Sequence, residues 1–249
     1  MNEGIRHPAA RLAIEVDDLD VFAVNLDAPE DVRAKLWSHL SPDEQRNAET
    51  FVFPEHQQRY VVGRGMLREL LAPRLGIPPG AIEFIGNAYG KPRLADVHRA
   101  AELNFNVSHS GSLALYAFCR DRDVGVDVEL MREIEDADDL AERFFSPAEA
   151  AALAALPADQ KSLAFLACWT RKEAFIKAIG LGLSCPLDAF DVSLEPDAPA
   201  RLLRIDPSID SVSNWSMQGF RPRDGYIAAV AHRPRGLVSQ DRLAAASAN

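Results

Sequence analysis

Two acidic residues, Asp127 and Glu129, lie in the run Gly125-Val-Asp-Val-Glu129. Successive side chains on a strand point to opposite faces, so this alternation predicts a strand with Val126 and Val128 in the core. Both acids would then emerge together on the other face. Two carboxylates at this spacing can share a hard cation such as Mg²⁺, which prefers oxygen ligands. The alternative is a half-buried strand whose acidic face is solvated.

A second candidate pair, Glu173 and Lys177, is four residues apart in a segment with helical spacing, so both side chains are expected on one helix face. An exposed pair of this kind is commonly a surface salt bridge worth only about 0.2–0.5 kcal/mol. The rest of the helix is strongly apolar, with Leu163, Phe165, Leu166, Trp169, Phe175, Ile176 and Ile179. Charges on such a helix need partners. We therefore interpret Asp127, Glu129, Glu173 and Lys177 as a group that converges in a cleft around a metal ion and a phosphate.

A third segment, residues 104–111, runs from a predicted strand into a turn. Ser108 and His109 can donate hydrogen bonds to an anion there, and Gly111 lets the backbone approach a ligand closely. The turn Gly90-Lys91-Pro92 presents one more cation. A single histidine or lysine in such a position is often structural, so neither turn identifies a ligand by itself.

The elements that must position these residues occur twice along the chain. Ser-Pro-x-Glu helix starts begin at Ser41 and at Ser146, 105 residues later, and the candidate strands at Val21 and Val126 are also 105 residues apart. Each half continues with an apolar helix (59–75 and 163–179) and a strand (81–85 and 190–194), and closing strands follow at 215–220 and 226–232. The order predicts an α+β (α/β) fold of two similar, pseudo-twofold-related lobes. We expect an N-terminal lobe over 12–110, a C-terminal lobe with the metal site over 111–234, flexible tails at 1–11 and 235–249, and a ligand site in the cleft between the lobes.

Composition limits the partners. The chain has 249 residues, is 47% hydrophobic and 26% charged, and carries a net charge of −10, which argues against nucleic acid as a ligand. An anionic ligand must therefore meet locally concentrated cations. The three cysteines are far apart and mostly in apolar sequence, as expected for buried thiols in a reducing compartment. No signal peptide or membrane span is predicted, and we expect a cytoplasmic protein.

Four motifs together resemble those of a known family. The motifs are Asn-Val-Ser-His-Ser-Gly at 106–111, Gly-Val-Asp-Val-Glu at 125–129, Arg-Phe-Phe-Ser-Pro-x-Glu at 143–149 and Trp-Thr-x-Lys-Glu-Ala-x-x-Lys-Ala at 169–178. They occur in the order found in 4′-phosphopantetheinyl transferases, of the larger two-lobed, Sfp-like class rather than the short trimeric holo-acyl-carrier-protein synthases. The resemblance covers roughly residues 40–194. Such enzymes move phosphopantetheine from coenzyme A to a serine of an apo acyl or peptidyl carrier protein, in fatty acid, polyketide or nonribosomal peptide biosynthesis, and release 3′,5′-ADP.

The resemblance implies a role for each matching position. Asp127, Glu129 and Glu173 would be ligands of Mg²⁺, or of Mn²⁺ in its place, and Glu173 is also a candidate base for the carrier serine. Lys177 would contact the pyrophosphate. The remaining coenzyme A contacts would be Arg59, Lys91, Ser108, His109, Asp127 and Lys172, with Arg59 on the helix that approaches the 3′-phosphate. The class also implies a monomer.

The sequence departs from the family at one place and leaves alternatives open. Relatives can carry lysines after the first Ser-Pro-x, where this chain has Glu44 and Asn47, so Arg46, Arg59 or Arg64 would have to hold the 3′-phosphate. One alternative is a metal-dependent phosphodiesterase, which would need further His or Asp ligands. Another is a carrier-protein-binding module with a decayed site. The apolar segment 175–187 is the candidate docking surface for the carrier. The alternative is that this segment is ordinary core and turn.

Overall fold

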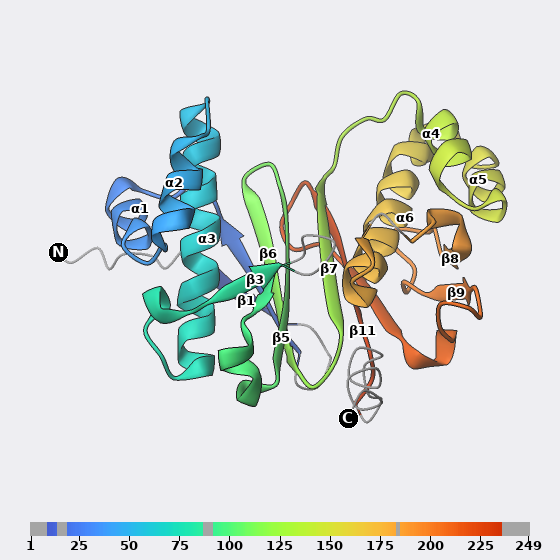
Figure 1. The fold of residues 1–249 in the computed structure, drawn as a ribbon. Helices are drawn as coiled ribbons and strands as arrows, with labels where there is room; N and C mark the ends of the chain where they lie inside the picture. Colours follow the sequence, from blue (N-terminus) through green and yellow to red (C-terminus); the bar gives the residue numbers. More distant parts are fainter. Residues whose placement is uncertain (1–8, 14–18, 87–91, 183–184, 236–249) are drawn as a thin grey trace.

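The computed structural model describes residues 9–13, 19–86, 92–182 and 185–235. The first lobe contains an antiparallel sheet of order β1-β2-β6-β5 and helices on its outer side (Figure 1). Its strands and helices are β1 (Ala9–Leu12), β2 (Leu19–Asn25), α1 (Glu30–Trp37), α2 (Pro42–Glu49), α3 (Pro54–Leu75), β3 (Phe84–Gly86), β4 (Pro92–Leu94), β5 (Leu103–Ser110) and β6 (Leu113–Arg120). The predicted strand at 81–85 begins later, at Phe84, because Pro79–Ala81 form a 3₁₀ turn.

The second lobe repeats this plan with a sheet of order β10-β11-β7. Its elements are β7 (Val124–Leu130), α4 (Ala137–Phe144), α5 (Pro147–Ala154), α6 (Ala158–Ile179), β8 (Phe190–Val192), β9 (Leu202–Ile205), β10 (Ser216–Phe220) and β11 (Tyr226–His232). The order β7-β11-β10 corresponds to β2-β6-β5, and α6 to α3. Both long helices have 22 residues and end at a glycine in the left-handed conformation, Gly76 and Gly180. The internal repeat is therefore a property of the fold.

Strand β6 belongs to the first sheet. It pairs with both β2 and β5, so that sheet extends to Arg120, beyond the lobe boundary predicted at residue 110. The pairing of β6 with β2 joins residues more than ninety positions apart, for example Ala117 with Val21. Local sequence does not encode such a contact.

In each lobe, the glutamate of the capping box contacts a basic residue of the long helix. Glu44 caps α2 and accepts a hydrogen bond from Arg68 on α3 at 2.7 Å, and Arg68 donates onward to the carbonyls of Pro79 and Ile82. Burial alone would raise the pKa of Glu44, but its hydrogen bonds with Arg68 and the Ser41 backbone, together with Arg64, lower it overall. Glu44 is thus a structural residue of the first lobe.

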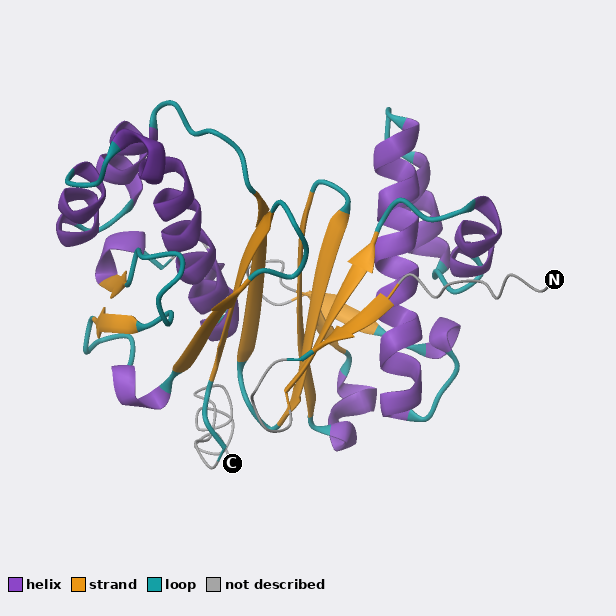
Figure 2. Cartoon of the chain, turned by 180° about the vertical axis from the view of Figure 1, so that it is seen from behind, coloured by secondary structure: helices purple, strands orange, loops and turns teal. Residues whose placement is uncertain are grey.

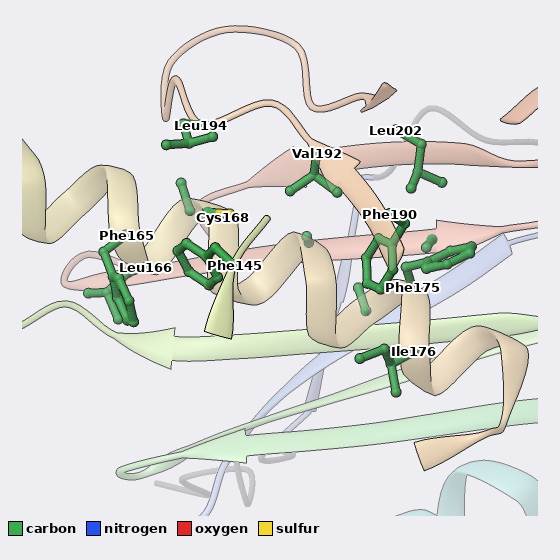
Figure 3. Packing of buried hydrophobic residues seen from close by; sticks show 14 of the residues in the cluster. Phe145, Phe165, Leu166, Cys168, Phe175, Ile176, Phe190, Val192, Leu194 and Leu202 are labelled. Atoms are coloured by element: carbon green, nitrogen blue, oxygen red, sulfur yellow. The ribbon is translucent and has the colours of Figure 1, made fainter. Parts of the chain in front are cut away.

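Three of the four hydrophobic clusters in the described residues set the layers. Apolar residues of α3 pack on the first sheet, and those of α6 pack on the second sheet and on β8, with Phe175 and Phe190 at 4.7 Å between ring centroids (Figure 3). A third cluster joins the inner faces of the two sheets, with Val126 and Val128 against Leu115. The layers run helix, sheet, sheet, helix, as seen from both sides in Figures 1 and 2. Within the described residues, none of the helices has the length and apolar character needed to cross a bilayer.

Candidate active site

Strand β7 presents its acids to helix α6. Val126 and Val128 are buried between the sheets, as the alternation predicts. Asp127 is on the opposite face but is only 4% exposed, so the alternative of a solvated acidic face is wrong for this residue. The helix reaches the strand so closely because of Gly125, where an added Cβ would lie 2.1 Å from the carbonyl oxygen of Ala174. This contact sets the second candidate pair beside the first.

Two side chains, those of Lys177 and Ser108, meet at one oxygen of Asp127. Lys177 Nζ donates to Asp127 Oδ1 at 2.6 Å, and Ser108 Oγ donates to the same atom at 2.7 Å. Lys177 Nζ also donates to Ser108 Oγ at 3.0 Å. The other oxygen, Asp127 Oδ2, is buried and has no hydrogen-bond partner among the described residues. Burial raises the pKa of Asp127, while Lys177 and Ser108 oppose that rise. A buried carboxylate oxygen without a donor is suited to a cation.

Glu173 and Glu129 complete the acidic cluster. Glu173 is half-buried one turn before Lys177, and its pKa is raised by burial first and by the charge of Asp127 next, with Glu129 adding to the rise and Lys177 opposing it. Glu129 accepts from Ser110 Oγ at 3.0 Å and pairs with Arg132. The carboxylates form an open cluster: among the described residues, no three His, Cys, Asp or Glu side chains already enclose a metal position.

Comparison with known proteins connects this cluster to a family. The family model "4'-phosphopantetheinyl transferase superfamily" matches residues 123–231, and "4'-phosphopantetheinyl transferase, N-terminal" matches 29–120. The chain is 39% identical over 220 residues to 4'-phosphopantetheinyl transferase HetI of Nostoc sp., with 88% of this chain and 90% of the relative covered. The chain belongs to the 4′-phosphopantetheinyl transferase superfamily.

Two further relatives show how widely the likeness extends. The chain is 32% identical over 214 residues to 4'-phosphopantetheinyl transferase Sfp of Bacillus subtilis (strain 168), covering 85% of this chain and 91% of the relative. It is also 32% identical over 216 residues to the human L-aminoadipate-semialdehyde dehydrogenase-phosphopantetheinyl transferase, covering 81% of this chain and 70% of the relative. Members of the family use coenzyme A to modify carrier proteins, so this chain is a phosphopantetheinyl transferase of the Sfp-like class.

The structure does not bring every expected residue of the transferase to this cluster. Lys172 is fully buried, and its ammonium donates to the carbonyls of Leu187 and Phe190 at 2.7 Å each and pairs with Glu149 at 2.7 Å. It occupies the place in the second lobe that Arg68 has in the first. That Lys172 contacts coenzyme A stays a prediction, and every donor contact shown for its ammonium lies within the protein core.

Two other expected contacts, His109 and Arg59, lie apart from the acidic cluster. His109 is exposed on the face of β5 opposite Ser108. Arg59 donates to Asp27 at 2.8 Å and pairs with Glu55 at 2.7 Å. Lys91 lies outside the described residues.

The segment 175–187 mixes buried and accessible residues in its described part, which leaves out 183 and 184. Phe175 is fully buried and Cys185 is 3% exposed, whereas Leu181 is 37% exposed. That this segment forms a docking surface for the carrier stays a prediction.

Two features of the site escaped the sequence reasoning. Asn106 and Ser110 lie two positions before and after Ser108, and both bond strand β7. The alternation in Asn106-Val-Ser-His-Ser110 is the signal that could have found them.

Beside the cluster, a cavity of about 690 Å³ opens between the lobes. Its described lining includes Val124 and Ala178, which are sequence neighbours of the cluster residues, but none of the acids of the cluster itself.

Proposed function

We propose that Asp127, Glu129, Glu173, Lys177 and Ser108 form the site at which the pyrophosphate of coenzyme A is bound and cleaved. The supporting observation is the buried carboxylate of Asp127, which has Lys177 and Ser108 on one oxygen and, in the described part of the chain, no partner on the other. A structural ion pair would need no orphaned oxygen. The acceptor in this proposal is a serine hydroxyl of an apo acyl or peptidyl carrier protein.

The same residues suit Mg²⁺. The donor set is carboxylate oxygen, which this hard cation prefers, and the orphaned Asp127 Oδ2 with Glu129 and Glu173 would hold it. When bound, Mg²⁺ neutralises charge on the pyrophosphate and supplies Lewis acidity at its oxygens. In an acidic protein with a net charge of −10, three nearby carboxylates would otherwise repel this ligand.

The side chains have separate tasks in the transfer. Lys177 supplies a positive charge beside the pyrophosphate, and Ser108 keeps Asp127 in place. The serine oxygen forms a bond to the phosphorus that carries pantetheine, and the bond from that phosphorus to 3′,5′-ADP breaks. Glu173 takes the serine proton, directly or through a water. Its raised pKa makes it a better base near neutral pH than an ordinary glutamate.

The 3′-phosphate needs a cation from the first lobe. Arg46 pairs with Asp43, Arg64 with Glu44, and Arg59 with Asp27 and Glu55. The side chain of Glu44 is only 9% exposed, whereas the partners of Arg46 and Arg59 are more than half exposed and can be resolvated when the arginine changes partner. Of these two we favour Arg59, because it is on the helix that the family resemblance places near the 3′-phosphate.

Both lobes of one chain contribute to the proposed site, Ser108 from the first and Asp127 with Lys177 from the second. We therefore propose that the transferase acts as a monomer of two lobes, divided after Arg120. We place the protein in the cytoplasm, where coenzyme A is available. The three free, buried cysteines of the protein stay reduced in that compartment.

Intact-mass analysis of apo carrier proteins incubated with coenzyme A tests the proposal. With Mg²⁺ the carrier should gain one phosphopantetheine group, and EDTA should prevent the gain until Mg²⁺ is restored. Glu173→Gln should abolish most of the transfer, whereas Glu142→Gln, an exposed glutamate on α4, should not. Carrier binding without any mass gain would support a binding module instead, and full activity of Glu173→Gln would refute the assigned base.

A further inference from the structure

Strands β5 and β7 lie side by side although they belong to different sheets. Each is an edge strand: β5 forms its backbone ladder with β6, and β7 forms its ladder with β11. The lobes therefore meet along the edges of two strands. Neither backbone ladder fixes which residues of β5 lie beside which residues of β7.

Side chains bridge these edges. Asn106 Oδ1 accepts from the backbone nitrogen of Val126 at 2.8 Å. Ser108 Oγ donates to Asp127 Oδ1 at 2.7 Å. Ser110 Oγ accepts from the nitrogen of Leu130 at 3.1 Å and donates to Glu129 at 3.0 Å. We call these bonds, between 106–110 and 126–130, the seam.

The seam fixes which residues of the two lobes face each other. Asn106, Ser108 and Ser110 are alternate residues, so they lie on one face of β5. A slip of one residue along the strand would turn this face away and present Val107 or His109 to Asp127 instead of Ser108. Neither can reproduce the bond network at Asp127, since valine has no polar atom and a histidine ring is far larger than a hydroxyl.

Asn106 differs from the two serines. It is 5% exposed and bonds the backbone of β7 rather than a carboxylate. Its bond holds the peptide nitrogen one residue before Asp127. A change at Asn106 can therefore move the acid without removing any group from the acidic cluster.

We propose that Asn106 is a positioning residue of the transferase. No backbone ladder joins β5 to β7, and the hydrogen bond of the Asn106 amide fixes their register instead. In this register Ser108 and Lys177 bond one oxygen of Asp127, and the other oxygen stays available to a cation. The inference rests on the proposed function of that cluster.

Asn104 offers a matched control. It lies on the same face of β5, and its amide donates to the backbone carbonyl of Arg122 at 2.6 Å, away from the acids. Asn106→Leu and Asn104→Leu each remove one such amide while keeping the branched arrangement of side-chain heavy atoms, and both should lower the melting temperature. Only Asn106→Leu should also weaken binding of Mn²⁺ to the protein without coenzyme A, by about ten-fold or more, as found for residues that orient metal ligands. Transfer to a carrier should fall by a similar factor.

Titration with Mn²⁺, thermal unfolding and transfer measured on the same preparations decide the matter. If Asn106→Leu lowers the melting temperature but keeps Mn²⁺ affinity and turnover at the level of Asn104→Leu, the residue is only structural and the inference is overturned. If Asn106→Leu does not fold, Asn106→Ala, which leaves room for a water on the Val126 amide, gives the same comparison. Wild-type protein that transfers nothing would instead refute the proposed function, while the ratio of Mn²⁺ affinities still tests the seam.

Discussion

Replacing Lys177 by methionine tests the electrostatics of the cluster. Lys177 is the cation that contacts Asp127, at 2.6 Å, and the side chains are 27% and 5% exposed. The variant keeps most of the apolar stem and removes only the ammonium. Asp127 is then left buried with Ser108 as its donor.

The cost of this change follows from the burial of Asp127. Breaking a buried ion pair by removing one partner costs about 3–5 kcal/mol. Ser108 remains and Lys177 is partly exposed, so we expect about 2–3 kcal/mol, within the range for hydrogen bonds to charged groups. For a chain of this size that corresponds to a fall of roughly 4–12 °C in melting temperature.

The penalty should depend on pH with a definite sign. Burial raises the pKa of Asp127 above its ordinary 3.8, and Lys177 opposes that rise, so the variant raises this pKa further. A carboxyl whose pKa is raised by folding favours the folded state at low pH and loses that contribution as pH rises through the folded pKa. The difference in melting temperature between wild type and Lys177→Met should therefore be largest near pH 8 and narrow towards pH 5.

Calorimetry across this pH range is the assay, with Lys161→Met as control. Lys161 is on the same helix, but its partner Asp138 is 46% exposed, so its loss should cost under about 1 kcal/mol. The double variant Asp127→Asn with Lys177→Met should recover most of the lost stability, since position 127 then carries no charge that needs a partner. A pH-independent loss, or a double variant no more stable than Lys177→Met, would refute the reasoning.

Three further outcomes are expected. Glu173→Gln should reduce transfer by about 10²-fold or more. It should also raise the melting temperature near pH 8, because burial and Asp127 raise the pKa of Glu173 and so make its charged form costly in the folded state. Calorimetry should show this gain shrinking as pH falls towards the ordinary pKa of 4.5. Ser108→Ala should lower stability by about 1 kcal/mol in urea unfolding and reduce turnover, and an unchanged turnover would contradict its role at Asp127. Lys172→Met should cost at least about 3 kcal/mol, because Glu149 and two carbonyls lose their donor. Isothermal titration of the folded Lys172→Met fraction should give unchanged affinity for coenzyme A, and a specific loss would restore the sequence-based assignment.

Much of the site follows from local pattern. Alternation in 125–129 predicts the strand and the shared face of Asp127 and Glu129, and helical spacing puts Glu173 and Lys177 on one face. The two Ser-Pro-x-Glu starts predict the capping boxes, which both form. These features depend on residues within one or two turns of each other, which is why a sequence can specify them.

Tertiary packing decided which charges meet. Lys172 and Lys177 share one helix and one motif, yet they are five residues apart and so point roughly 140° apart around the axis. Periodicity shows that they diverge but not which of them faces β7. The close approach of α6 at Gly125 settles that, and it sends Lys172 to Glu149 and Lys177 to Asp127.

The sequence by itself determined the residue types, the repeat and the local faces, because each depends on short-range geometry. The fold alone decided that Ser108 of one lobe would meet Asp127 of the other, that β6 would join the first sheet, and that His109 would turn away. Those contacts join segments that are far apart in the chain, and their register is set by burial and by hydrogen bonds such as that of Asn106 with Val126.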